Sequence, residues 1–393
     1  MKVLFITPAY FPNLRGGNER SIKIIAEGLA NKDISVAVLS FDAKNNTQEE
    51  HYKGVKVIRV KKLKISPNTL AHNLSLLKCR NLIEKEHPDI IHVFNTWHIP
   101  AATFFKDIAP LVVTLNNYFP IIATAYTKDN IIESKKSNLF KVVHSIKGTI
   151  KGDIVKRYLL GLFYGIYSIF VRFYSKRADK YIVYASPIGK IYYKWGFDKR
   201  KFVTISSPVE KNKIQKTIKR DKKSVLYVGG AYEAKGFYEL LEATKYVKTK
   251  DVQFYFVGIN TVPEKVKEFV KNNNINAYFI RKLDALKLVE YYKKSSVLIH
   301  PSIWPEPFSR VWIEALQYNI PIISADNPVA LEILKGAAIF YHRGEPKELA
   351  TRIDSFFKSK IKLDQTKAKR KIFESNPVKR LIEVYNNLLK NNS

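Results

Sequence analysis

The sequence predicts an α/β protein of two domains, each built around a parallel sheet that helices cover on both faces. Short runs rich in β-branched residues alternate with amphipathic segments of helix length, which is typical of strands joined by helical crossovers. The 393 residues exceed what one hydrophobic core usually organises. Hydrophobic residues make up 46% of the chain and charged residues 26%, a globular composition that excludes wholesale disorder.

Two series of candidate strands define the domains. The first series is residues 3–7, 35–41, 55–60, 90–93, 111–115, 181–184 and 202–205, and the second is 225–228, 253–257, 277–280, 297–300, 320–323 and 337–340. A polar, Lys-rich run at 206–223 lacks apolar periodicity and indicates a linker. We therefore expect an N-terminal domain at 1–206 and a C-terminal domain at 207–375. The amphipathic end, 376–393, is expected to pack back on the first domain.

The two halves also resemble each other. VLFITPAY at residues 3–10 and VLYVGGAY at 225–232 each lead from a strand into a glycine-containing loop and then a helix. This pattern predicts two Rossmann-like domains that face a cleft.

The charge is unusual. The chain has 67 Lys and Arg against 35 Asp and Glu, a net +32, which attracts polyanions or anionic membranes. No zinc spacing or RNA-binding signature accompanies it, so no nucleic acid is expected as partner. The single cysteine, Cys79, excludes an intrachain disulfide. The N-terminus lacks the order of a signal peptide, and a cytoplasmic location is predicted.

The longest uncharged apolar stretch, residues 158–171, has 14 residues and is too short to span a bilayer. Basic residues flank it: Lys151, Lys156, Arg157, Arg172, Lys176 and Arg177. Two interpretations remain open, a helix packed against the N-terminal domain and a helix lying at an anionic membrane surface.

Glycines follow the first strand of each half. Gly16 and Gly17 precede a helix expected to start near Glu19, where backbone N–H groups and the helix dipole can face an anion. In the second half a strand ends at Gly229 and Gly230, and Lys235 comes directly before Gly236 at a helix start. A lysine at that place can neutralise charge on a leaving phosphate.

The segment HPSIWPEPFSRVWIEAL carries two glutamates, Glu306 and Glu314. They lie eight positions apart, a little over two helical turns, across a loop that becomes a helix. One carboxylate is expected near the helix start and one deeper along it, so both can point toward one ligand. Carboxylates accept hydrogen bonds from sugar and ribose hydroxyls. The backbone N–H groups of 308–311 (Phe308, Ser309, Arg310 and Val311) are expected to face a phosphate.

These motifs, in this order over nearly the whole chain, resemble the retaining family 4 glycosyltransferases of the GT-B architecture. The resemblance implies that Glu314 binds the donor ribose, Glu306 contacts the donor sugar and Lys235 grips the diphosphate. It also implies that Gly16 or Gly17 lets the N-terminal loop approach the donor. No cofactor beyond the nucleotide-sugar co-substrate and no metal is expected. The acceptor would be a glycan or a lipid-linked glycan.

Relatives often carry an arginine where this chain has Gly230, a histidine where it has Asn116, and a glycine where it has Ser309. Asn116 can still donate to a sugar hydroxyl, and His98 is a candidate for acceptor binding, whereas His92 is expected in the core. Three alternatives stay open: a catalytically weak GT-B protein that binds glycans, a sugar-nucleotide epimerase and a basic nucleic-acid-binding protein.

Overall fold

In the computed structural model the chain forms two compact units. The structure describes residues 1–13, 16–123, 130–133, 139–147, 153–210, 220–221, 223–359 and 363–391. One unit comprises Met1–Glu210 with Asn376–Ser393, and the other comprises Lys211–Ser375. The division lies a few residues after the predicted boundary, and most of the predicted linker falls outside the described residues.

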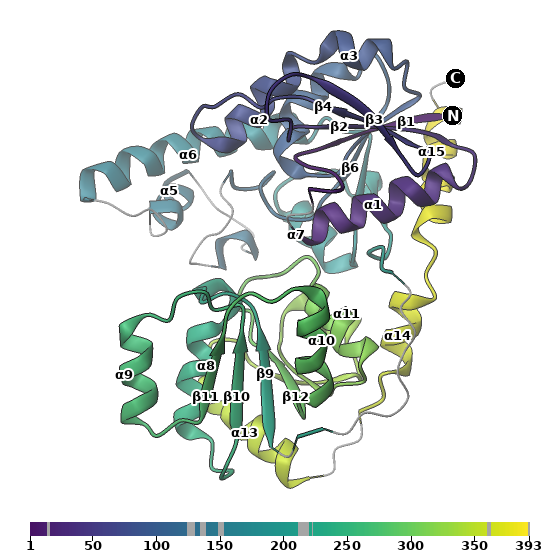
Figure 1. Ribbon diagram of the computed structural model, residues 1–393. Helices are drawn as coiled ribbons and strands as arrows, with labels where there is room; N and C mark the ends of the chain where they lie inside the picture. Colours follow the sequence, from purple (N-terminus) through teal and green to yellow (C-terminus); the bar gives the residue numbers. More distant parts are fainter. Residues whose placement is uncertain are drawn as a thin grey trace. The chain divides into compact units, whose positions relative to one another are not determined.

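The first unit contains an eight-stranded sheet of order β3-β4-β2-β1-β5-β6-β7-β8 (Figure 1). Its strands are β1 Lys2–Thr7, β2 Ser35–Ser40, β3 Gln48–Tyr52, β4 Val55–Arg59, β5 Ile90–Val93, β6 Leu111–Thr114, β7 Lys180–Val183 and β8 Phe202–Thr204. Seven of them match predicted strands and pair in parallel. The antiparallel edge strand β3 was not predicted, because its QEEHY sequence is polar and mostly exposed.

The helices of this unit include the crossovers between its strands. They are α1 Gly17–Ala30, α2 Asn68–Leu77, α3 Arg80–Lys85, α4 Ile99–Ala102, α5 Leu139–Lys147, α6 Ile154–Ser175, α7 Ser186–Lys194 and α15 Pro377–Lys390. The apolar stretch at 158–171 lies inside α6. Because α6 also takes in Lys156, Arg157 and Arg172, it has 22 residues, and by length and composition it could cross a membrane. The apolar stretch alone therefore underestimates the length of the helix, and length does not exclude that α6 crosses a membrane.

The second unit contains a six-stranded, all-parallel sheet of order β11-β10-β9-β12-β13-β14. Its strands are β9 Ser224–Val228, β10 Gln253–Val257, β11 Ala277–Ile280, β12 Val297–His300, β13 Ile322–Ala325 and β14 Ala338–Tyr341. Its helices are α8 Phe237–Ala243, α9 Glu264–Asn272, α10 Ala285–Lys294, α11 Arg310–Gln317, α12 Pro328–Ile333, α13 Pro346–Lys358 and α14 Thr366–Phe373. Every strand predicted for this half is present, with shifts of one or two residues at some ends.

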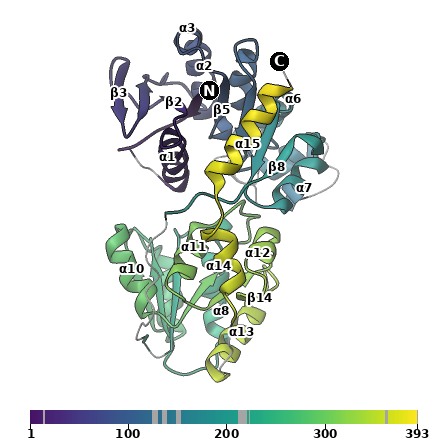
Figure 2. The same cartoon turned by 90° about the vertical axis from the view of Figure 1, so that its right-hand side faces the viewer.

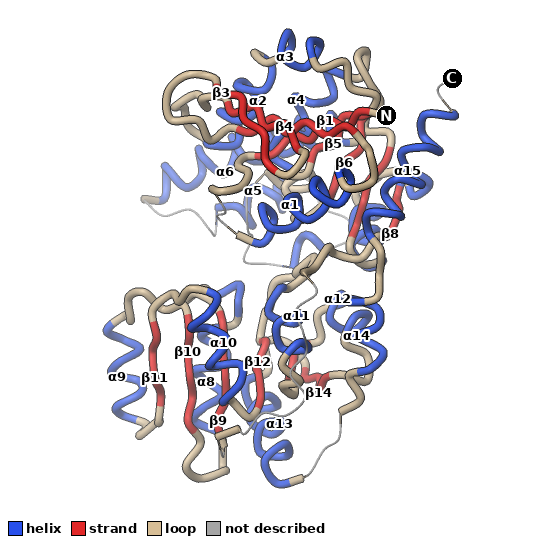
Figure 3. The backbone as a smooth tube through the Cα atoms, turned by 45° about the vertical axis from the view of Figure 1, so that its right-hand side comes forward, coloured by secondary structure: helices blue, strands red, loops and turns tan. Residues whose placement is uncertain are grey.

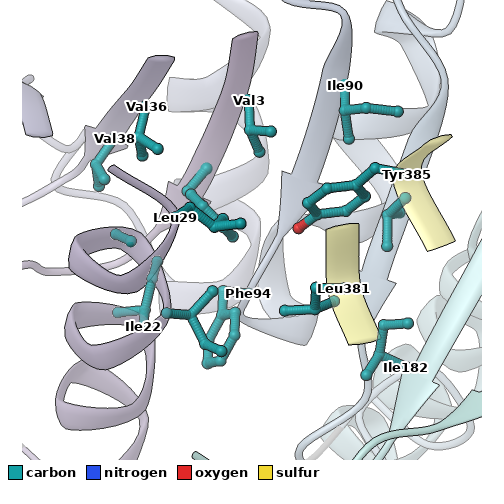
Figure 4. Close-up of a cluster of buried hydrophobic side chains, with 14 of the residues drawn as sticks. Val3, Ile22, Leu29, Val36, Val38, Ile90, Phe94, Ile182, Leu381 and Tyr385 are labelled. Atoms are coloured by element: carbon teal, nitrogen blue, oxygen red, sulfur yellow. The ribbon is translucent and has the colours of Figure 1, made fainter. Parts of the chain in front are cut away.

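The C-terminal helix α15 completes the core of the first unit (Figure 2). Leu381 and Tyr385 pack in one buried cluster with Ile90 and Ile182 (Figure 4). The Tyr385 hydroxyl lies 2.6 Å from Nδ1 of His92, whose Nε2 lies 2.8 Å from the Thr114 hydroxyl. His92 is fully buried, which confirms that it is a core residue.

Both sheets reverse their strand order beside their first strand. Counted within the second unit, the order is 3-2-1-4-5-6, the Rossmann arrangement, with the reversal between β9 and β12. In the first unit the reversal lies between β1 and β5 (Figure 3). Ligands of such sheets bind beyond the carboxyl ends of the strands at the reversal. We therefore expect a site in the loops that follow β1, β5, β9 and β12.

Candidate functional site

In the second unit, the loop after β9 brings Lys235 close to the end of β12. The chain leaves β9, makes a short 3₁₀ turn at Glu233–Lys235 and enters α8 through Gly236. Gly236 has φ +69°, in the left-handed region that favours glycine. A Cβ at this position would lie 1.8 Å from the carbonyl oxygen of Pro301. Glycine therefore lets the turn rest directly on the backbone that follows β12.

Hydrogen bonds lock the two loops together. The carbonyl oxygen of Ala234 accepts from the Ser302 hydroxyl at 3.1 Å and from the Trp304 N–H at 3.2 Å. The side-chain amide of Asn327, which begins α12, donates to the Trp304 carbonyl at 2.7 Å, and so does the Glu306 N–H. Two neighbouring elements, the turn at Ala234 and the start of α12, and one bond within the loop therefore hold the loop that carries Glu306.

Lys235, Glu306 and His300 form a charged cluster at this edge of the sheet. The Lys235 ammonium group donates to Oε1 of Glu306, and Nε2 of His300 lies 3.3 Å from Oε2. The Glu306 and His300 side chains are 3% and 7% exposed, whereas Lys235 is 48% exposed. The carboxylate of Glu306 is therefore buried, whereas the ammonium group of Lys235 reaches solvent.

The pKa of the Glu306 carboxyl is set by opposing influences. Burial is the largest and raises it, but the charges of Lys235 and His300 and their hydrogen bonds together outweigh burial. The net result holds the pKa of Glu306 well below its ordinary value. The carboxylate stays ionised at neutral pH and can only accept hydrogen bonds.

The two glutamates do not share a helix. Helix α11 begins at Arg310, so Glu306 lies in the preceding loop and only Glu314 is helical. The predicted change from loop to helix between the two glutamates is confirmed, although the helix begins four residues after Glu306. Glu314 accepts a hydrogen bond from the hydroxyl of Tyr292 on α10 at 2.7 Å. The buried Tyr292 side chain thus holds the Glu314 carboxylate in one orientation.

The start of α11 lies between these two carboxylates in the chain. Ser309 is the N-cap residue, is buried, and makes no side-chain capping bond. Phe308 precedes it, and Arg310 and Val311 begin the helix; the Phe308 ring packs against Trp312 with centroids 6.1 Å apart. The dipole of α11 adds positive potential at this end, as the sequence analysis expects for phosphate binding.

Gly229 and Gly230 end β9 as expected. The Tyr227 hydroxyl donates to the Gly230 carbonyl at 2.8 Å, and the ring of Tyr232 fills the space where a side chain at 230 would begin, 2.1 Å from an ideal Cβ. The Tyr232 ring is 67% exposed. An arginine at position 230 would require the Tyr232 ring to move. The position of this ring therefore suits the glycine that this chain has at 230.

In the first unit, helix α1 begins at Gly17, two residues before the expected start. Gly16 is its N-cap, with an extended backbone (φ −167°), and an added Cβ would meet Glu19 at an ordinary 3.6 Å. The backbone therefore does not require glycine at 16. Glu19 already brings a buried acidic group into the first turn.

Arg59, at the end of β4, fixes the loop between β1 and α1. Its guanidinium donates to the carbonyl oxygens of Tyr10 and Phe11 and forms a 2.8 Å ion pair with Asp42. The side chains of Arg59 and Asp42 are 5% and 1% exposed. Glu50, on the unpredicted strand β3, also pairs with Arg59. This buried network orients the loop that carries the glycines.

His98 and Asn116, both expected to bind the acceptor, have different surroundings. His98 is fully buried, with Nε2 3.1 Å from Nδ1 of His72 and its ring stacked on Phe41 at 4.7 Å. Burial, followed by the nearby His72, lowers the pKa of His98 well below its usual value. His98 is a core residue here, which corrects the prediction of direct acceptor contact.

Asn116 lies just beyond β6 and is only partly buried. Its side-chain amide donates to the Phe94 carbonyl, directly after β5, at 2.8 Å. Its Oδ1 is buried and has no hydrogen-bond partner among the described residues. Asn116 therefore remains placed at the carboxyl edge of the first sheet.

Sequence reasoning missed His300 and Tyr292. A signal for His300 was available, because it is the last residue of a predicted strand and directly precedes the loop of Glu306. No signal in the sequence indicated Tyr292, because it lies on α10 and only the fold shows which residues this helix contacts. Within the part of the chain that the structure describes, no group of three or more His, Cys, Asp or Glu side chains is placed to hold a metal ion.

Two Rossmann-like units, each with the strand order reversing beside its first strand, are the architecture of the GT-B glycosyltransferases. Solved structures agree in fold: sucrose-phosphate synthase from Thermosynechococcus elongatus (TM-score 0.70, 16% identity, 99% of both chains) and the lipopolysaccharide outer core galactosyltransferase WaaB (0.67, 16%, 100% of both). The Anabaena protein HepE, solved in complex with UDP and glucose, matches with TM-score 0.66 and 15% identity over 99% of both chains.

The chain belongs to glycosyltransferase family 4. The profile of Glycosyltransferase Family 4 matches residues 15–213, and that of Glycosyl transferases group 1 matches 208–373. A curated relative, an uncharacterized 42.6 kDa protein in the cps region of Klebsiella pneumoniae, is 25% identical over 80% of this chain and 83% of its own length. The spore coat protein SA of Bacillus subtilis is 30% identical over 39% of this chain and 45% of its own.

Proposed function

We propose that this enzyme transfers a sugar, with retention of its anomeric configuration and without a metal, from a nucleoside-diphosphate sugar to a glycan or lipid-linked acceptor. The observation that carries the proposal is the cluster of Lys235, Glu306 and His300 at the strand reversal of the second unit. The cps-region relative favours the synthesis of a cell-surface polysaccharide, and HepE shows that this fold can hold UDP and glucose. We propose that it acts in the cytoplasm.

Each group in the cluster has a chemical task in this proposal. The half-exposed Lys235 has further N–H bonds to donate to the diphosphate of the donor. Glu306, kept ionised, accepts hydrogen bonds from hydroxyls of the donor sugar. Glu314, oriented by Tyr292, accepts from the ribose hydroxyls. The N-terminus of α11 adds backbone N–H groups for a phosphate.

The transfer needs no protein base. The acceptor hydroxyl oxygen bonds to the anomeric carbon on the face that the diphosphate leaves, and a departing diphosphate oxygen takes the hydroxyl proton. Lys235 stabilises the negative charge that builds on the leaving group, and Glu306 orients the sugar ring. We assign the loop of Gly16 and Gly17 to the donor and Asn116 to the acceptor.

Calorimetric titration with UDP, GDP and ADP tests the donor site. One of the three should bind, and Lys235→Ala should weaken it by roughly 10- to 100-fold, because a hydrogen bond to a charged group contributes about 1.5–3 kcal/mol. Lys267→Ala is the control: it removes the same charge from an exposed lysine of α9 in the same unit and should change nothing. Binding of none of the nucleotides, or equal losses in both variants, would refute the assignment.

The stereochemistry requires a separate experiment. Once a donor is known, proton NMR of the first-formed product gives the anomeric configuration. Retention together with full activity in the presence of a chelator is the expected result. Inversion, or loss of activity on chelation, would contradict the proposed mechanism while leaving the donor site intact.

A further inference from the structure

Helix α6 presents large apolar side chains to solvent instead of to the core. Val155, Leu159, Leu162, Ile166, Phe170 and Phe173 are each between 47% and 64% exposed. Their spacing of three or four residues places them on one stripe along the whole helix. Figure 1 shows α6 reaching away from the sheet of the first unit, with α5 beside it. Such a continuous exposed apolar stripe marks an interaction surface.

The opposite face of α6 is buried and consists mostly of small side chains, with Val171 packed against Phe119 and Ala123. Gly161, Gly165 and Ser168 are buried, and the Ser168 hydroxyl accepts from the N–H of Ala123 at 2.9 Å. Arg172 donates to the Ile121 carbonyl at 3.3 Å, with its guanidinium 4.9 Å from the Trp195 ring. The largest apolar side chains of α6 are therefore exposed, unlike those of a surface helix in water, whose polar face points outward.

These contacts decide between a helix that spans a membrane and one that lies on it. At about 1.5 Å per residue the 22 residues of α6 extend about 33 Å, enough to cross the hydrocarbon layer. However, Ser168 and Arg172 tie its inner face to loops of the first unit, which would then have to enter the hydrocarbon. The arrangement fits a helix that rests on the surface with one face immersed.

The charges identify the occupant of this surface. Lys156 and Arg177 are exposed near the two ends of α6, and the Arg177 guanidinium lies 4.9 Å from the Phe173 ring at the edge of the apolar stripe. Cations bordering an apolar stripe match lipid phosphates above acyl chains. A second copy of the chain would instead bring another net charge of +32 against the first.

We infer that the outer face of α6 docks this enzyme on an anionic lipid bilayer, with the apolar stripe immersed and the flanking cations at the phosphates. This inference does not depend on the donor or on the transfer reaction. It predicts that the full chain binds vesicles of mixed phosphatidylglycerol and phosphatidylcholine, and binds pure phosphatidylcholine vesicles less well.

Vesicle flotation with two matched triple variants tests the surface. Leu159→Gln, Leu162→Gln and Ile166→Gln together should lower the partition coefficient more than about tenfold, because a buried Leu or Ile side chain contributes strongly to transfer from water. The control places glutamine at three exposed apolar positions elsewhere, Ile65, Leu286 and Leu331, and should bind like the wild type. Neither triple changes the net charge, and circular dichroism confirms that both variants fold.

A charge variant and a site-specific label complete the test. Lys156→Gln with Arg177→Gln should weaken binding to anionic vesicles roughly tenfold and leave the neutral ones unchanged. An environment-sensitive fluorophore on Ile166→Cys should shift its emission to the blue with vesicles, and one on Leu286→Cys should not. The native Cys79 does not interfere, since burial raises the pKa of its thiol to about 11.

Three results would overturn the inference. The first is no binding of the wild type to anionic vesicles at low salt. The second is equal binding by the two triple variants. The third is a wild-type dimer in solution that the α6 triple variant converts to a monomer, which would make the stripe an interface between copies of this chain. Nucleotide titration reports separately on the donor site, so failure of either proposal is recognisable.

Discussion

Replacing Gly236 by alanine should damage the donor site without touching any side chain in it. The Cβ would lie 1.8 Å from the Pro301 carbonyl oxygen, and real contacts of this kind stay beyond 3.0 Å. The two backbone segments must therefore separate by about 1 Å or more. One segment carries Lys235 and the other leads to Glu306, and the bonds from Ser302 and Trp304 to Ala234 are the ones that stretch.

The expected loss of stability has two parts. A non-glycine residue in the left-handed region costs about 1–2 kcal/mol, and relieving the overlap adds roughly 1–3 kcal/mol. The sum, about 2–5 kcal/mol, should lower the melting temperature of this unit by roughly 4–20 °C. Displacing the lysine from its partner should also weaken the nucleotide identified by titration, about tenfold to a hundredfold.

Gly336→Ala is the matched control. Gly336 lies in the same unit at φ +79°, but an added Cβ meets no atom within 4 Å. Gly336→Ala should lower the free energy of unfolding only by the cost of a non-glycine residue in the left-handed region, and it should bind nucleotide normally. Thermal unfolding and calorimetry on both variants measure the difference. If Gly236→Ala melts and binds like Gly336→Ala, the contact with Pro301 does not position the site and the reasoning fails.

Three further predictions concern buried ionisable groups. Burial lowers the pKa of His92 from 6.5 to about 3, so His92 is neutral in the folded protein and the unfolded chain binds a proton first as the pH falls. The stability of the folded state therefore declines below about pH 6.5. Between about pH 7 and 5, the free energy of unfolding measured in urea should fall by about 2 kcal/mol more in the wild type than in His92→Asn. Arg59→Met removes the ion-pair partner of the buried Asp42 carboxylate and should lower the free energy of unfolding by about 3–5 kcal/mol, and adding Asp42→Asn should recover much of this loss in a double-mutant cycle. Because the pKa of Glu306 is held below its ordinary value, its carboxylate is ionised at neutral pH. Glu306→Gln removes that charge and should bind the nucleotide-sugar more weakly in calorimetric titration at about pH 7.

Much of the candidate site could be predicted from the sequence because its residues follow strands. Lys235 and Glu306 each come shortly after a strand whose alternation or apolar run is visible in the chain, and parallel strands share a carboxyl edge. The sequence could not reveal that these two side chains pair, since 71 positions separate them. It also misjudged His98, because burial depends on the elements that cover a loop, here Phe41 and His72.

The sequence by itself determined the two Rossmann-like units, the order of their strands along the chain and the motifs of the family, because local periodicity and turn chemistry are written in neighbouring residues. The tertiary structure decided which strands lie side by side, that Gly236 rests on Pro301, and that α15 closes the core of the first unit through Tyr385 and His92. It also decided which face of α6 is buried. These facts arise from packing between residues far apart in the chain, and such packing has no local signature.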